Sequence, residues 1–432
     1  MTDNHESDVP TLEPQAALEL WKQGSKVWND WVAENPIYNI DFSELDFEPC
    51  RSVPSSSISF DDYRFPKGQV NFTNTHFGDG PTLFNNTSFG EGDVDFSGVF
   101  FGRFDLVFTN AKFGKGKIRF LADFGQESDV NFQGTDFGDG ETDFSDSVFH
   151  AGKVDFSHCY FGKGQVTFNK VKYSHANVLF EKIYCAADFT MTSPEDLKDL
   201  SFRGATLERS LDLKKVSTLS VIDLVGTRIS NQLSLFHYTY NIHREPRYRK
   251  VYTDRQKISY RLKRRYLSPL KSRRPYDSEK LNRLKELAEV NKDHGLALRA
   301  NADEHRVRRW RTMSTAHSML DMLYSGLCDY GQSILRPLLY WWLSIVMFGG
   351  VYAMLASTTT SVRQVWELMM FSAANSLPFL AQARTARGIG IDTHFVQSDM
   401  LAWVIPIVLF QGVVSVVLVF LLGLGLRNRF RL

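Results

Sequence analysis

The chain has 432 residues, a net charge of +1 and 43% hydrophobic residues. A chain of this length is too long for one ordinary compact hydrophobic core, so we expect several structural units. The four cysteines are scattered without a Cys-x-x-Cys pair, which argues against a zinc site or a disulfide framework and fits a reducing compartment: Cys50, Cys159, Cys185 and Cys328.

Residues 1–36 are expected to form a disordered tail and a capping helix. The stretch 1–12 is acidic and polar, without the apolar run of a cleavable signal peptide. Residues 13–35 predict one amphipathic helix that Pro36 ends, and its apolar side carries Leu18, Trp21, Val27, Trp28, Trp31 and Val32. We expect this helix to cover the first coil of the repeat that follows, because an open strand edge invites aggregation.

A ladder of phenylalanines dominates the next part of the chain. One series recurs at every twelfth position without a break: Phe60, Phe72, Phe84, Phe96, Phe108, Phe120, Phe132, Phe144, Phe156, Phe168 and Phe180. A second series stands five positions after each rung: Phe65, Phe77, Phe89, Phe101, Phe113, Phe137, Phe149, Phe161 and Tyr173. So strict a period predicts a solenoid whose stacked rings form the core.

The residues around each rung indicate short strands with one inward face, because small or β-branched residues stand two places before the ring. Seam glycines are expected to supply the positive φ that tight corners require: Gly80, Gly92, Gly116, Gly140, Gly152 and Gly164. The pentads at 94–98 (Val-Asp-Phe-Ser-Gly) and 154–158 (Val-Asp-Phe-Ser-His) resemble the bacterial pentapeptide-repeat family. This resemblance implies a right-handed, four-sided parallel β-helix over residues 37–240.

The two-residue seam departs from the plain family pattern, so a full coil is expected to take two of these repeats. At about 4.8 Å per coil, residues 60–185 would form a rod about 25 Å tall. Gly125 stands where a ring is due and Phe124 precedes it, which predicts a bulge near 121–129. Leucine pairs that recur at every eleventh position then predict shorter corners to about residue 237.

Residues 241–336 are expected to form a basic linker, a helical hairpin and an interfacial helix. Residues 241–312 hold 22 Lys and Arg against 9 Asp and Glu, whereas residues 60–185 hold 12 against 17. The basic stretch suits either nucleic acid or anionic lipid headgroups, and its place before a hydrophobic span favours lipid. Residues 277–311 predict two antiparallel helices, and 313–335 predict an amphipathic helix that lies on the membrane or packs on the hairpin.

Residues 337–432 are expected to form a membrane domain with two uncharged spans, 337–356 and 400–426. The positive-inside bias places both termini in the cytoplasm, which corresponds to a multi-pass protein of the bacterial inner membrane. The predicted headgroup-binding residues flank these spans: Arg261, Lys263, Arg264, Arg265, Lys271, Arg273, Arg274, Arg427, Arg429 and Arg431.

Between the spans, residues 362–381 form an apolar run too short to cross a bilayer, so it is either re-entrant or interfacial. This layout is similar to the two-transmembrane, pore-loop plan of the potassium-channel superfamily. That resemblance implies a pore shared by several subunits, four if the plan holds. The sequence lacks Thr-Val-Gly-Tyr-Gly, so potassium selectivity does not carry over. The pore or filter candidates are Ser372, Asn375, Ser376, Pro378, Gln411, Gly412 and Ser415. The last three fit a helix–helix contact equally well.

The expected fold is therefore a mainly β solenoid with an N-terminal capping helix, followed by a helical hairpin and a two-span membrane domain. Catalytic motifs are absent, and we expect no enzyme activity, cofactor or metal. Two functions remain open. One is an oligomeric channel-like protein regulated through its cytoplasmic solenoid. The other is a membrane-tethered scaffold without a pore, whose solenoid binds an unknown protein; nucleic acid is not the expected partner of either.

Overall fold

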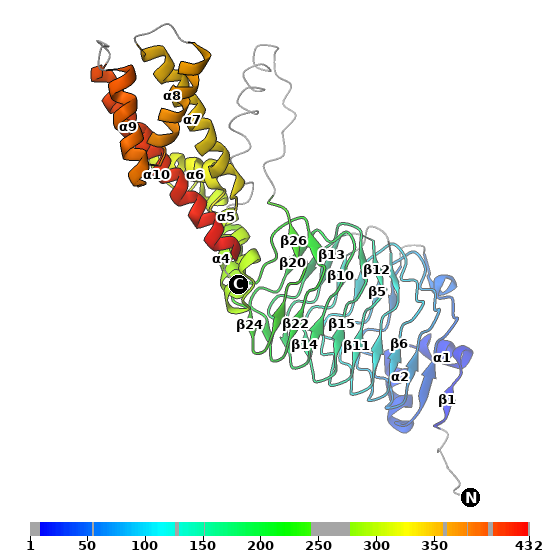
Figure 1. Ribbon diagram of the computed structural model, residues 1–432. Helices are drawn as coiled ribbons and strands as arrows, with labels where there is room; N and C mark the ends of the chain where they lie inside the picture. The colour runs from blue at the N-terminus through cyan, green and yellow to red at the C-terminus, as the bar shows by residue number, and fades with distance from the viewer. Residues whose placement is uncertain are drawn as a thin grey trace, which may run out of the picture. The chain divides into compact units, whose positions relative to one another are not determined.

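The computed structural model describes residues 9–53, 56–125, 129–150, 152–242, 277–356, 361–377, 379–395 and 401–430. The chain divides into two compact units, Met1–Val307 and Arg308–Leu432, and each is described by itself. In the described residues, the first unit is a parallel β-solenoid with helices at both ends, and the second is helical (Figure 1). The predicted fold class is confirmed.

Each coil passes through four sides, and the strands of successive coils pair in parallel. The first side contains β1 (Thr11–Leu12), β2 (Asn39–Asp41), β4 (Val70–Asn71), β6 (Val94–Asp95), β8 (Ile118–Arg119), β11 (Thr142–Asp143), β15 (Val166–Thr167), β19 (Phe189–Thr190), β22 (Leu211–Asp212) and β25 (Leu233–Ser234). A second side contains β3 (Ile58–Ser59), β5 (Thr82–Leu83), β7 (Leu106–Val107), β10 (Val130–Asn131), β13 (Lys153–Asp155), β17 (Asn177–Leu179) and β20 (Asp199–Ser201).

The other two sides are made of shorter ladders. One contains β9 (Asp123–Phe124), β12 (Val148–Phe149) and β16 (Lys172–Tyr173), and chain order continues it with β23 (Ser217–Thr218) and β26 (Thr239–Tyr240). The other contains β14 (Tyr160–Phe161), β18 (Tyr184–Cys185), β21 (Thr206–Leu207) and β24 (Arg228–Ile229). Isolated bridges such as Lys112 to Asp136 extend the ladders through the earlier coils.

The phenylalanine rungs stack into continuous columns inside the solenoid. In one column, centroid separations between successive rings lie between 4.5 and 5.0 Å: Phe60, Phe84, Phe108, Phe132, Phe156, Phe180 and Phe202. A neighbouring column holds Phe42, Phe72, Phe96, Phe120, Phe144, Phe168 and Phe189. Rings of the two columns meet edge to face, as at Phe108 and Phe120. Because stacked and edge-to-face rings both pack densely, the interior is a filled aromatic core.

The register confirms the predicted coil lengths. Val130 pairs with Val154, which is two of the phenylalanine repeats, whereas Leu211 pairs with Leu233, which is two of the shorter leucine repeats. At the predicted irregular place, Phe124 takes the rung itself, stacking 5.4 Å from Phe101 and 4.2 Å from Phe149. The coil before this rung is one residue shorter and the coil after it one longer, so the aromatic column continues without a gap.

One corner of the solenoid requires glycine for a reason the sequence did not reveal. A Cβ added to Gly116 would overlap the carbonyl oxygen of Gly92, and Gly140 meets Gly116 in the same way. Of the six seam glycines expected to have positive φ, only Gly152 does, with φ +83, so the prediction is wrong for Gly80, Gly92, Gly116, Gly140 and Gly164. Close approach between coils, rather than left-handed backbone, therefore selects glycine here.

Two helices, rather than the predicted single one, cover the first coil. They are α1 (Pro14–Trp21) and α2 (Ser25–Glu34), separated at Gly24, whose φ of +90 is incompatible with a continuous helix. The Trp28 ring is fully buried, and its Nε1 donates to the Arg64 carbonyl oxygen at 2.8 Å. Trp21 Nε1 donates to the Ser59 carbonyl oxygen at 3.0 Å. The indoles thus satisfy carbonyl groups of the first coil.

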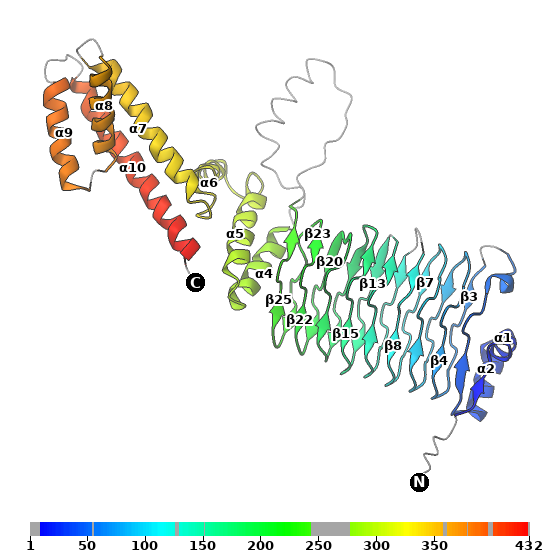
Figure 2. The same ribbon diagram turned by 45° about the vertical axis from the view of Figure 1, so that its right-hand side comes forward.

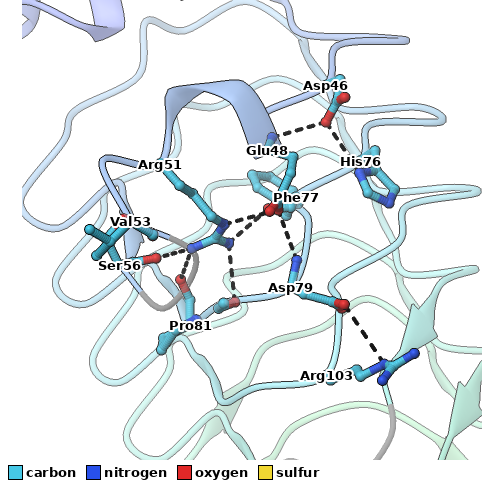
Figure 3. A network of polar contacts seen from close by, with 11 residues as sticks. Asp46, Glu48, Arg51, Val53, Ser56, His76, Phe77, Asp79, Pro81 and Arg103 are labelled. Carbon is cyan, nitrogen blue, oxygen red and sulfur yellow. Dashed lines mark hydrogen bonds and ion pairs between the residues drawn. The ribbon is translucent and has the colours of Figure 1, made fainter.

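A buried arginine fastens an insertion in this first coil. Asp46 pairs with His76, a longer step than in later coils, because the short 3-10 helix η1 (Glu48–Cys50) and its flanks are inserted. Arg51 donates to the carbonyl oxygens of Phe77 (2.7 Å), Gly80 (3.1 Å) and Ser56, and its Nε lies 3.4 Å from Glu48 (Figure 3). One planar guanidinium therefore satisfies carbonyls from both the insertion and the second coil.

We expect Arg51→Lys to lower the free energy of unfolding by about 2 kcal/mol, because a lysine cannot reproduce the fork and leaves buried carbonyls unpaired. Urea unfolding of the detergent-purified chain measures this loss. The matched control is Arg103→Lys in the same region, since Arg103 is 69% exposed and lies 3.8 Å from Asp79. Equal midpoints for the two variants would contradict the role of Arg51.

The predicted hairpin is present, and it covers the last coil (Figures 1 and 2). It consists of α4 (Asp277–Val290) and α5 (His294–Arg308), whose buried apolar residues join the solenoid core. Tyr240 donates its hydroxyl to Asp303 at 2.9 Å, and the Arg299 guanidinium lies 4.5 Å above the Tyr240 ring. Burial beside Asp303 raises the pKa of Tyr240 well above its ordinary value, so the phenol stays protonated and keeps this bond.

Candidate functional site

The second unit contains two helices long and apolar enough to span a membrane, α7 (Leu335–Leu355) and α10 (Leu401–Phe430). They match the predicted spans and pack together, with the Phe348 and Phe410 rings 6.2 Å apart. A β-solenoid with two such helices fits a membrane-associated repeat protein.

Between α7 and α10 the chain turns back in two short helices. The first, α8 (Val362–Asn375), begins with a capping box in which Ser361 and Gln364 satisfy each other's backbone. It runs back along α7 far enough for Ser372 to donate to the Ile345 carbonyl oxygen, at 2.8 Å and at the middle of α7. The chain returns through α9 (Ala381–His394), which the sequence did not predict. The Phe395 ring then packs on Tyr352, near the C-terminal end of α7.

The α8–α9 hairpin therefore enters and leaves on the same side of the unit, beside the C-terminal half of α7 (Figures 1 and 2). The predicted re-entrant run, 362–381, corresponds to α8 and the tip of this hairpin. The helix itself ends at Asn375, and Pro378 lies outside the described residues.

A buried polar cluster holds the hairpin to α10. Gln411 Nε2 donates to the Ser372 carbonyl oxygen (2.9 Å), and it lies 2.8 Å from Ser372 Oγ and 3.1 Å from Ser376 Oγ. The Tyr352 hydroxyl donates to Gln411 Oε1 at 2.8 Å. All four side chains are buried. One amide thus joins α7, α8 and α10, in a place where an unpaired polar group would be costly.

Two buried residues of the same region stay unpaired. Asn375 is fully buried at the end of α8, and neither its side-chain nitrogen nor its side-chain oxygen makes a hydrogen bond with a described residue. Ser415 Oγ, on α10, is also buried without a partner.

The structure thus brings together three of the predicted pore candidates, Ser372, Ser376 and Gln411, and also buries Asn375 and Ser415. Within one chain these five side chains face other helices of the unit. Gly412 lies outside the cluster, where an added Cβ would meet no atom of the described residues within 4 Å.

The outer faces of α8 and α9 differ in polarity. Apart from Arg363 in its first turn, the exposed large side chains of α8 are apolar: Val362, Trp366 and Met370. On α9 the exposed residues include one large apolar side chain, Ile389, and five polar ones: Gln382, Arg384, Thr385, Asp392 and Thr393. Arg384 and Arg387 make no ion pair with any described residue, and Arg387 Nε is buried without a hydrogen bond. Sequence reasoning missed these arginines, although Arg-x-x-Arg between two apolar segments was a visible signal.

At the other end of the unit, α6 (Thr315–Cys328) exposes an apolar strip made of Met319, Leu320 and Leu323. Its polar side is fixed by a buried pair, in which Arg309 Nη2 lies 2.7 Å from Asp321 and Tyr330 donates to the same carboxylate at 2.8 Å. Burial raises the pKa of Tyr330 to about 12, so this phenol remains a donor at neutral pH.

Two of the predicted headgroup-binding residues, Arg427 and Arg429, lie in the last turn of α10, at the end where Asn428 bonds Gly331 beside α6. The other eight lie outside the described residues: Arg261, Lys263, Arg264, Arg265, Lys271, Arg273, Arg274 and Arg431. Lipid binding by these residues stays a prediction.

Comparisons of the chain with protein-family models, with curated proteins and with solved structures find no match. In the part of the chain that the structure describes, no group of three His, Cys, Asp or Glu residues could hold a metal ion. The α8–α9 hairpin, with its buried polar cluster and its two arginines, is the candidate functional site.

Proposed function

We propose that this chain is an integral membrane protein of a bacterial inner membrane whose copies assemble into a channel-like oligomer. In this proposal α7 and α10 span the bilayer, and α8 and α9 form a re-entrant hairpin. The basic end of α10, with Arg427 and Arg429, lies at the cytoplasmic surface, as the positive-inside bias requires. The solenoid precedes α7 and therefore lies in the cytoplasm, where its rigid rod would bind a partner and bias the oligomer.

The observation that carries the proposal is the charged outer face of α9. Its first turn follows the tip of a hairpin that reaches the middle of α7, so Arg384 would lie well inside the bilayer. An arginine in the middle of a spanning helix costs about 2.5–3.5 kcal/mol when it faces lipid. The apolar outer face of α8 has no such cost. Lipid suits the α8 face, whereas water held between several copies of the chain suits the α9 face.

A membrane-tethered scaffold without a pore is the second candidate, and the Gln411 cluster favours it. The polar groups at the end of α8 are bonded within one chain, as expected for an anchor closed on itself. In that case α9 would lie at the outer membrane surface, and the solenoid alone would carry the function.

The channel requires water access to α9, whereas conduction distinguishes it from the scaffold, because α9 at the membrane surface would also meet water. We expect Thr385→Cys to react with a membrane-impermeant thiol reagent in intact membranes and Met370→Cys to stay unreactive, although both positions are exposed in the single chain. A Cys50→Ser background removes the one native cysteine that is not buried. Labelled fractions are read by mass spectrometry.

Planar-bilayer recording of the purified chain then tests conduction directly. Labelling of Thr385→Cys together with single-channel currents is the expected result. Protection of Thr385→Cys from the reagent would reject the channel. A silent bilayer containing the reconstituted protein would reject the channel and leave the scaffold.

A further inference from the structure

We propose that the water-filled path selects small anions, and that Arg384 and Arg387 of each copy form the selecting site. This inference rests on the proposed channel and adds the sign of the permeant ion. The site is incomplete in one chain, because it requires the α9 faces of several copies around a shared axis.

The two helix ends at the hairpin tip differ in their availability to an ion. The C-terminal end of α8 presents carbonyl groups, which favour a cation. Gln411 closes this end by donating its amide to the Ser372 carbonyl oxygen at 2.9 Å, and Ser376 Oγ donates to the same oxygen at 3.1 Å. The cation-favouring end is therefore already occupied by the chain itself.

The N-terminal end of α9 is open by comparison. Its N-cap, Leu380, offers no side-chain acceptor to the first turn, and only its carbonyl oxygen accepts, from the Ala383 and Arg384 N–H groups. Among the described residues, the positive end of the helix dipole therefore has no capping side chain. Arg384 lies in the next turn and is exposed, so its charge adds to the dipole at the same depth. Both terms attract an anion to the tip of the hairpin.

Arg387 supplies the second, independent observation. Its Nε is buried without a hydrogen bond, one turn before Gly390, where an added Cβ would meet the Phe371 ring of α8. Asn375 lies one turn beyond Phe371 and is fully buried, and its side chain also stays unpaired. A guanidinium donor and an amide donor without partners in one buried region match an anion that has lost part of its water. The Asn375 side-chain oxygen is an acceptor and cannot donate a hydrogen bond to an anion. Arg387 is therefore the principal donor.

The acidic side chains of the hairpin lie elsewhere. Glu367 is 3.2 Å from Arg363 and 3.7 Å from His394, in the outer half of the hairpin, and Asp392 is near the outer end of α9. Among the described residues, no carboxylate of α8 or α9 lies in the turns next to the tip. The charge next to the tip of the hairpin, its deepest part in the proposed membrane, is therefore positive.

Reversal potentials of the full-length protein in a planar bilayer under a KCl gradient test the inference. We expect the wild-type potential to lie near the chloride equilibrium potential. Arg384→Gln should lower the chloride-to-potassium permeability ratio about tenfold, which corresponds to about 1.4 kcal/mol. Arg384→Glu should move the potential toward that of potassium, and Arg384→Lys should retain chloride preference. The matched control is Arg363→Gln, which removes the same charge from an 89% exposed side chain at the start of α8.

The outcomes separate the proposed channel from the proposed anion site. No current from any variant would overturn the proposed channel, and the anion site with it. Current that prefers potassium in the wild type, or a ratio that Arg384→Glu leaves unchanged, would overturn the anion site alone. A change in Arg363→Gln as large as that in Arg384→Gln would also overturn it, because the charge of α9 would then have no special role.

Discussion

Replacing Phe132 with alanine is expected to lower the free energy of unfolding by about 4 kcal/mol. The ring is fully buried and stacks 5.0 Å from Phe108 and 4.8 Å from Phe156, so its loss interrupts a column on both sides. Coils contact only their neighbours, and the rod has no other route for closing such a gap. Urea unfolding of the detergent-purified chain, followed by far-UV circular dichroism, measures the loss.

The control for this prediction is Phe236→Ala, because the Phe236 ring is 62% exposed. Its removal should change the free energy of unfolding by less than about 0.5 kcal/mol. Similar losses at Phe132 and Phe236 would contradict the view that the ring columns, rather than phenylalanine content, stabilise the solenoid.

Gly116→Ala is expected to cost about 3 kcal/mol, because the new methyl group would overlap the Gly92 carbonyl oxygen and force two coils apart. The same substitution at Gly326, in α6, meets no atom within 4 Å and should stabilise its helix by up to about 1 kcal/mol. Thermal unfolding of both variants gives the comparison. A neutral Gly116→Ala would show that the coils have room at this corner.

The solenoid could be predicted from the sequence because a phenylalanine recurs at every twelfth position. Each half-coil therefore places one ring of this series in the core. Even the irregular place at Phe124 was visible, since one ring stood a residue early. The break at Gly24 was not predicted, because apolar periodicity continued through it. The capping role of α4 and α5 depends on contacts such as Tyr240 with Asp303, far apart in the chain, which no local pattern encodes.

The candidate site was predicted in part. The polar residues at the end of α8 that the sequence singled out are buried together, and their burial depends on Gln411, which reaches Ser372 from another helix. The α9 helix was missed because Gly388 and Gly390 lower its helix propensity and its outer face is polar. Its packing against α8, where Gly390 lies against the Phe371 ring, explains why such a segment is helical.

The strands of the second side from Ile58 to Val178 keep one register, so that Ile58 pairs with Thr82 and Val154 pairs with Val178 at the same spacing along the chain. Duplicating or excising one such coil away from the irregular place at Phe124 restores the same neighbours at the join. The rod would then change its reach by about 4.8 Å per coil. The number of coils therefore sets the distance between the N-terminal end of the solenoid and the α4–α5 hairpin at its other end. Duplication of the sequence of one coil would be enough to change this distance.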